Sequence, residues 1–136
     1  MTRKELQVTN ITKLPSGRGI VTDCGGITLL NIYAPSGTAR SVERENFFNT
    51  KLAYLLRNVP DNFFLGGDVN CLVQSADTTS HCTHRRALAE LVQGFALKDV
   101  WKQPSTWRVY THYSPTGATH IDLFYATTDL YERKIF

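Results

Sequence analysis

Cysteine is scarce in this chain, and its spacing argues against the usual cysteine-based scaffolds. The three cysteines, Cys24, Cys71 and Cys82, form no CxxC pair, and an odd number cannot complete a disulfide framework. A zinc site within residues 81–84 (His-Cys-Thr-His) would need a second pair of ligands, which the sequence does not offer. We therefore expect a reducing, intracellular compartment, either the nucleus or the cytoplasm.

Long apolar runs are also missing. No stretch approaches the length of a membrane span, and the basic start Met1-Thr2-Arg3-Lys4 is followed by no hydrophobic region of a secretory signal. The net charge of +3 is compatible with a polyanionic partner but too small to demand one. We expect no membrane contact and no secretion, and a length of 136 residues suits one domain, 1–136, or a piece of a larger one.

The first quarter of the chain has the pattern of short strands. Three β-like runs, Leu6–Leu14, Gly19–Asp23 and Ile27–Tyr33, are separated by Pro15-Ser16-Gly17 and Cys24-Gly25-Gly26. The third run is largely apolar on both alternating faces, which predicts a strand covered on two sides, as in a layered sandwich.

Two amphipathic helices are expected next. Ser41 is the predicted cap of a helix whose apolar residues recur at helical spacing until Pro60. Residues Leu88–Phe95 carry a second stripe of this kind. Near the end of the chain, runs Arg108–Tyr113 and Thr119–Tyr125 predict a β-hairpin.

An acid interrupts the last apolar run. Asp122 alternates with Ile121 and Leu123, so we expect its carboxylate inside an otherwise apolar strand. A buried carboxylate is costly unless a cation or a hydrogen-bond donor lies beside it. Asp122 is therefore a candidate functional residue.

The most informative segment is Asn62–Asn70. Three large apolar residues followed by Gly66-Gly67 predict a buried strand that stops in a tight turn, with Asp68 and Asn70 at its carboxyl end. Ligands of open α/β sheets collect at that edge, and an acid with an amide there can align a water against a phosphate or hold a hydrated metal. Gly-Gly-Asp-x-Asn is also ordinary turn material, so a purely structural role stays open.

Four segments in order widen the argument. These are Asn31-Ile32-Tyr33-Ala34-Pro35, Gly67-Asp68-Val69-Asn70, Tyr110-Thr111-His112-Tyr113-Ser114 and Thr119-His120-Ile121-Asp122. Together they resemble the endonuclease/exonuclease/phosphatase superfamily, and within it the apurinic-endonuclease-like domain of non-LTR retrotransposons. The resemblance implies an α/β fold, the four-layer α/β sandwich of the deoxyribonuclease-I-like type, here expected to be incomplete at both termini.

The resemblance also implies roles for the catalytic positions. Asp68 matches the carboxylate that orients or deprotonates the attacking water, and Asn70 the amide that holds this water and a phosphate oxygen. Tyr33 matches the tyrosine that hydrogen-bonds the scissile phosphate, and Asp122 the acid that orients a catalytic histidine.

The substrate and the metal follow from the same resemblance. Thr111 and Asn31 match positions beside the DNA substrate. The implied cofactor is Mg²⁺, with Mn²⁺ as the alternative, and Asp68 is the metal ligand that can be matched. Neither Glu5 nor Asp23 has the context of the family's metal-binding glutamate.

Other departures from the family bear on activity. The family's closing Ser-Asp-His segment is not found, and His120 stands where the retrotransposon branch usually has arginine or lysine. We therefore expect a Mg²⁺-dependent nicking endonuclease linked to reverse transcription, part of a retrotransposon polyprotein and weak or inactive as this chain alone. A catalytically dead remnant or nucleic-acid-binding module is the alternative, and a sugar- or inositol-phosphate phosphatase is less favoured by residues 106–125.

Overall fold

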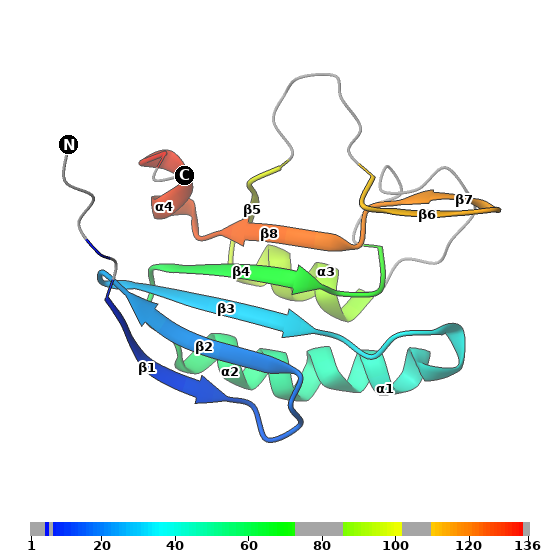
Figure 1. Cartoon of the computed structure of the whole chain (residues 1–136), viewed down its shortest axis with the longest axis horizontal. Coiled ribbons are helices and arrows are strands. Elements are labelled where there is room, and N and C mark those ends of the chain that lie inside the picture. The colour runs from blue at the N-terminus through cyan, green and yellow to red at the C-terminus, as the bar shows by residue number, and fades with distance from the viewer. Residues whose placement is uncertain (1–4, 6, 73–85, 102–109, 135–136) are drawn as a thin grey trace.

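A computed structural model of the chain describes residues 5, 7–72, 86–101 and 110–134. The described residues form one six-stranded sheet in which β3 and β4 run parallel and the other neighbours antiparallel (Figure 1). A separate two-stranded ladder projects beyond the sheet. The sheet order is β1 (Val8–Lys13), β2 (Gly19–Cys24), β3 (Ile27–Tyr33), β4 (Phe63–Asp68), β8 (Asp122–Ala126) and β5 (Lys98–Asp99); the ladder is β6 (His112–Ser114) with β7 (Gly117–Thr119).

The predicted first helix is a continuous helical stretch between β3 and β4. It contains η1 (Thr38–Arg40), α1 (Ser41–Asn46), the π-helical η2 (Phe47–Leu52) and α2 (Ala53–Asn58). Two further helices follow, α3 (Arg86–Gly94) and α4 (Thr128–Glu132). In the described ranges, no helix combines the length and the apolar character that crossing a membrane requires.

The expectation that Ser41 caps this helix is wrong. The N-cap of α1 is Arg40, whose side chain makes no capping bond. The 3₁₀ turn that precedes α1 already supplies a carbonyl for the Ser41 N–H, which donates to the oxygen of Thr38. Ser41 therefore lies inside a continuous helical stretch and not at its start. A side-chain cap is needed only where the first N–H groups of a helix have no backbone acceptor.

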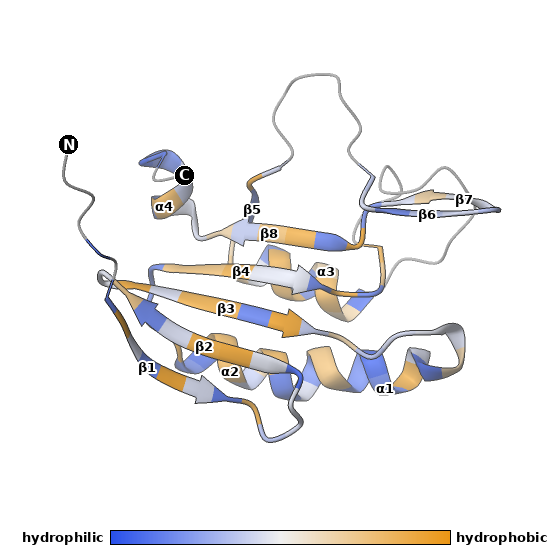
Figure 2. Ribbon diagram, in the orientation of Figure 1, coloured by the Kyte–Doolittle hydropathy of each residue, from blue (hydrophilic) through white to orange (hydrophobic). Residues whose placement is uncertain are grey.

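The main core lies between one face of the sheet and the helices. Apolar side chains of the central strands pack here against the inward stripes of η2, α2 and α3, as the hydropathy colouring indicates (Figure 2). Each such side chain contributes about 1.5–3 kcal/mol on burial. The cluster includes Leu30, Ile32, Leu65, Leu123 and Tyr125 of the sheet, and Phe47, Phe48, Leu52, Leu56 and Leu88 of the helices.

The opposite face of the sheet is only partly covered, which corrects the prediction of a β3 strand buried on two sides. Asn31 and Tyr33 on this face are exposed. A smaller cluster centred on Phe64, Ala126 and Leu130 covers part of the face, with the rings of Phe64 and Phe124 stacked at 5.1 Å. The smaller cluster covers β3 only at Ile27 and Leu29, and the second half of the strand extends beyond it, so this part of β3 is exposed on one face.

The paired glycines lie within β4 and do not form the predicted turn. Gly67 has φ +130°, and a Cβ built on it would lie 1.9 Å from the carbonyl oxygen of Ile32. Glycine is thus needed here for the close approach of β3 and β4. The chain turns instead at Asn70, which has φ 51°.

The last predicted hairpin also differs. The run 119–125 is divided, since β7 ends at Thr119 in the small ladder and β8 begins at Asp122 in the main sheet. Asp122 is exposed, contrary to expectation, because it is the first residue of β8 and lies at the sheet's rim on the face away from the helices. The segment 81–84 lies outside the described residues.

Candidate active site

Three neighbouring strands bring Tyr33, Asp68 and Asp122 together. In the register of the sheet Tyr33 is paired with Asp68, and Asp68 with Asp122. Paired residues in adjacent strands have side chains on the same face, and neighbouring strands are about 4.8 Å apart. The phenol and the two carboxylates therefore form a row along the rim, on the face opposite the main core. The strands β3, β4 and β8 that carry them lie side by side (Figure 1).

Asn70 is held against this row by two hydrogen bonds. Its backbone N–H donates to Oδ1 of Asp68 at 2.9 Å, and its side-chain Nδ2 donates to the carbonyl oxygen of Ala34 at 2.9 Å. The backbone N–H of Ala34 in turn donates to the carbonyl oxygen of Asp68 at 2.9 Å. Because Nδ2 is engaged by Ala34, the orientation of the amide plane of Asn70 is defined, and Oδ1 lies on its other side.

Thr111 ties the start of β8 to this arrangement. Its hydroxyl oxygen accepts the backbone N–H groups of Ile121 and Asp122, each at 3.1 Å. The backbone N–H of Thr111 donates to the carbonyl oxygen of Thr119 at 2.9 Å. Thr111 therefore fixes the backbone that carries the Asp122 carboxylate.

Asn31 lies one step further from the rim, on the same face as Tyr33. It is paired in register with Gly66, and its Oδ1 lies 2.9 Å from the position that a Cβ on Gly67 would take. The structure thus places Tyr33, Asp68, Asn70, Thr111 and Asp122 at the rim shared by β3, β4 and β8, with Asn31 one step further in on the same face. Their chemical roles stay predictions.

Burial and a like charge both act on Asp68. Partial burial is the largest influence and raises the pKa of its carboxyl above the usual value of 3.8, while the hydrogen bond from the Asn70 N–H lowers this pKa. The negative charge of Asp122 raises the pKa of Asp68 further. A positive charge on His112 lowers it. Asp68 is therefore a better proton acceptor than an ordinary surface carboxylate.

Arg18 was missed as a site residue. Its guanidinium lies 5.9 Å from the centre of the Tyr33 ring, its Nη1 donates to the Tyr33 carbonyl oxygen at 3.5 Å, and its Nη2 lies 3.8 Å from Oε1 of Glu43. A signal was present in the sequence. A hairpin that turns at Gly25-Gly26 places residue 18 opposite residue 33, as the pairing of β2 with β3 shows.

The positions of His112 and His120 could not be predicted from a sequence motif. His112 lies on the β6–β7 ladder, close enough to act electrostatically on Asp68. His120 is buried, and neither ring nitrogen has a hydrogen-bond partner in the structure. No local pattern predicts either fact, since both depend on how segments far apart in the sequence meet in the folded chain.

The donor set fits a hard divalent cation only in part. Among the described residues, no group of three or more His, Cys, Asp or Glu side chains is positioned to hold a metal. Asp68 and Asp122 nevertheless form a like-charged register pair, and their mutual repulsion would be relieved by a cation between or beside them. Two carboxylates suit Mg²⁺, which uses few protein ligands and retains several waters.

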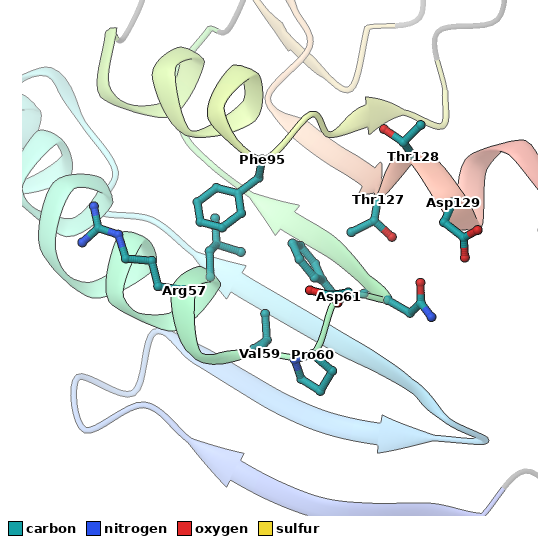
Figure 3. A pocket seen from close by; sticks show the side chains of 11 residues that line it. Arg57, Val59, Pro60, Asp61, Phe95, Thr127, Thr128 and Asp129 are labelled. Carbon is teal, nitrogen blue, oxygen red and sulfur yellow. The ribbon is translucent and has the colours of Figure 1, made fainter.

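Tyr33 and Asp122 are exposed at the rim, and Asp68 is partly buried. A pocket of about 490 Å³ lies at the other end of β4, where Val59, Phe95 and Asp129 are among its lining residues (Figure 3). No predicted site residue lines it. An exposed rim suits an extended polymer better than a small enclosed ligand.

Comparison with known proteins gives the fold. No family model and no curated protein matches the sequence. An AP endonuclease from Archaeoglobus fulgidus is similar in structure, with a TM-score of 0.79 and 20% identity over 93% of this chain. The 3'-5' exonuclease NExo from Neisseria meningitidis (TM-score 0.73, 19% identity) and the endonuclease domain of TRAS1, a telomere-specific non-LTR retrotransposon (0.63, 16%), are similar over the same share.

This chain has the α/β fold of the endonuclease/exonuclease/phosphatase superfamily, so the predicted resemblance is confirmed at the level of the fold. It spans 61% of the length of the archaeal enzyme, 60% of NExo and 56% of the TRAS1 domain. The fold shared with these proteins therefore corresponds to part of each.

Proposed function

We propose that this chain hydrolyses phosphodiester bonds in DNA, as part of the nicking endonuclease of a non-LTR retrotransposon linked to reverse transcription. One observation carries the proposal, namely the row of Tyr33, Asp68 and Asp122 across three adjacent strands. The fold is shared with a DNA hairpin-bound 3' phosphatase and with a retrotransposon endonuclease domain. DNA is thus the proposed substrate, and the rest of a longer retrotransposon polyprotein is the proposed partner. The proposed compartment is the nucleus or the cytoplasm.

Each residue at the rim has a proposed role in the hydrolysis. The carboxylate of Asp68 would orient a water and accept its proton. The amide of Asn70, fixed through Nδ2, would accept a hydrogen bond from this water at Oδ1, and the second Nδ2 hydrogen would be the donor to a phosphate oxygen. The Tyr33 hydroxyl would donate to the phosphate, while Arg18 beside it contributes positive charge next to the polyanion.

Mg²⁺ is the proposed cofactor, with Mn²⁺ as an alternative. Asp68 would be its protein ligand, and the neighbouring Asp122 carboxylate would add negative charge for the cation. When bound, the ion supplies charge neutralisation at the phosphorus and the leaving oxygen.

A nicking assay tests the proposal. Supercoiled plasmid is incubated with Mg²⁺ and either this chain or a version extended at both ends, each with a matching Asp68→Asn variant. We expect the extended protein to nick at least about a hundredfold faster than its Asp68→Asn variant, because the proton acceptor is lost. The short chain is expected to be slower than the extended one.

Equal nicking by the extended protein and its Asp68→Asn variant would show that the site assignment is wrong. The second candidate is a non-catalytic nucleic-acid-binding remnant, which the small number of metal-binding side chains among the described residues favours. It predicts DNA binding that survives Asp68→Asn and no nicking by either protein.

A further inference from the structure

Arg44 is an unusual charged residue, because its side chain is buried on the helix side of the site. It is 4% exposed, and its Nη1 donates to the carbonyl oxygens of Pro35 at 2.6 Å and Gly37 at 3.2 Å. Its Nε has no hydrogen-bond partner, and no carboxylate pairs with it in the part of the chain that the structure describes. A buried guanidinium without a counter-ion is costly, so stability alone is a poor reason for an arginine here.

The loop that Arg44 holds is the loop that orients Asn70. The carbonyl oxygen of Ala34 accepts the Nδ2 of Asn70, and the next carbonyl along the chain, that of Pro35, accepts from Arg44. Ala34 and Pro35 are both buried. The two peptide planes share the Cα of Pro35, whose ring fixes φ, so only the ψ rotation of Pro35 separates a shift of its carbonyl from a shift of the Ala34 carbonyl.

Asn70 depends on such support. Its backbone has φ 51°, in the left-handed region, which asparagine adopts more readily than most other L-residues, so the backbone alone does not fix the side chain. Its side chain has no bond other than the one to Ala34 among those seen in the structure. If the Ala34 carbonyl moved, the amide could rotate and exchange the positions of its oxygen and nitrogen.

We propose that Arg44 is a positioning residue, which holds the Ala34–Pro35 carbonyls so that the amide of Asn70 presents its oxygen to the rim. The consequence for catalysis rests on the proposed function, since the orientation of Asn70 matters for rate only if Asn70 holds the water or the phosphate. The structural part of the proposal concerns Arg44 and Asn70 alone.

The structural part is tested by NMR, from the solvent exchange of the Asn70 side-chain amide protons. Wild type is compared with Arg44→Met, which keeps much of the volume and removes the donors, and with Arg40→Met as control. Arg40 lies four residues earlier and makes only an exposed pair with Glu43 at 3.6 Å. We expect exchange about tenfold faster in Arg44→Met, and within about twofold of wild type in Arg40→Met.

Arg44→Lys covers the case in which Arg44→Met does not fold. A lysine can donate to one carbonyl but lacks the planar fork, so exchange should rise by a smaller factor than in a folded Arg44→Met. Wild-type exchange of the Asn70 amide in a folded Arg44→Met, or in Arg44→Lys when it is the only folded variant, would overturn the proposal.

Nicking kinetics test the catalytic part in the longest version of the protein that nicks DNA. Arg44→Met should lower kcat by about tenfold and leave KM within about twofold, while Arg40→Met changes neither. A rise in KM with unchanged kcat would overturn this part. If neither the short nor the extended wild type nicks DNA, the proposed function is wrong, and amide exchange still decides whether Arg44 orients Asn70.

Discussion

Asp68 and Asp122 are paired in register between the antiparallel strands β4 and β8, so two carboxylates share one position at the rim of the sheet. The charge of Asp122 adds to partial burial in raising the pKa of Asp68. An arrangement of like charges lowers stability in the absence of a cation and is typical of sites that perform proton or metal chemistry.

The first prediction concerns stability against pH. Because the pKa of Asp68 is raised in the folded state, the folded protein binds this proton more tightly than the unfolded chain. Stability is therefore lost as the pH rises from 3.8 through the folded pKa, and the loss is complete above it. Asp68→Asn, which keeps an oxygen for the Asn70 N–H, should be more stable than wild type at neutral pH.

Denaturant unfolding at neutral pH and below pH 3.8 measures this effect. The advantage of Asp68→Asn should shrink towards zero at the acid pH, where the carboxyl of the wild type is protonated in both states. Asp122→Asn, which removes the neighbouring charge, should stabilise in the same direction at neutral pH. If Asp68→Asn is more stable than wild type by the same amount at both pH values, the pKa of Asp68 is not raised in the folded protein.

The second prediction separates the two glycines of β4. Gly67→Ala would place a Cβ 1.9 Å from the Ile32 oxygen at φ +130°, so it should destabilise by more than about 3 kcal/mol. Gly66→Ala would place a Cβ 3.2 Å from the Phe124 ring and 3.6 Å from the Leu123 carbonyl oxygen, and it should cost roughly 1 kcal/mol. Thermal or denaturant unfolding of both variants decides, and equal costs would mean that the β3–β4 approach is not tight.

Thr111 is the subject of the third prediction. Thr111→Val removes the acceptor of the Ile121 and Asp122 N–H groups, so amide hydrogen exchange at these two residues should accelerate by about fivefold to tenfold. Thr111→Ser keeps the hydroxyl and serves as the matched control, with exchange close to wild type. Unchanged exchange in Thr111→Val would show that another group fixes the start of β8.

The fourth prediction concerns the packing of α3. Leu88 is fully buried in the main core, so Leu88→Ala should lower the free energy of unfolding by about 3 kcal/mol. Leu91 on the same helix is only partly buried, and Leu91→Ala should cost less than half as much. Denaturant unfolding checks the difference, and similar losses would indicate that α3 is rotated from this orientation.

Local sequence patterns gave correct predictions where the structure depends on contacts between residues that are close in the sequence. The run Ile27–Tyr33 is β3 to the residue, and the predicted stripe lies on α3 except for Phe95, which follows the last residue of this helix. The motif around Asp68 and Asn70 was correctly placed at the carboxyl end of a strand. Periodicity and turn composition act over a few residues, so they can be interpreted without knowing the rest of the fold.

The tertiary structure decided how these pieces meet. The close approach of Ile32 to Gly67, the exposure of Asp122 and the place of His112 beside Asp68 all depend on strands that are far apart in the sequence. The sequence alone determined the position of β3, of the first helical stretch and of α3, and the residue types at the rim. Their common site, and the raised pKa of Asp68, required the sheet order β3-β4-β8, because burial and charge act through space between residues that the chain does not join.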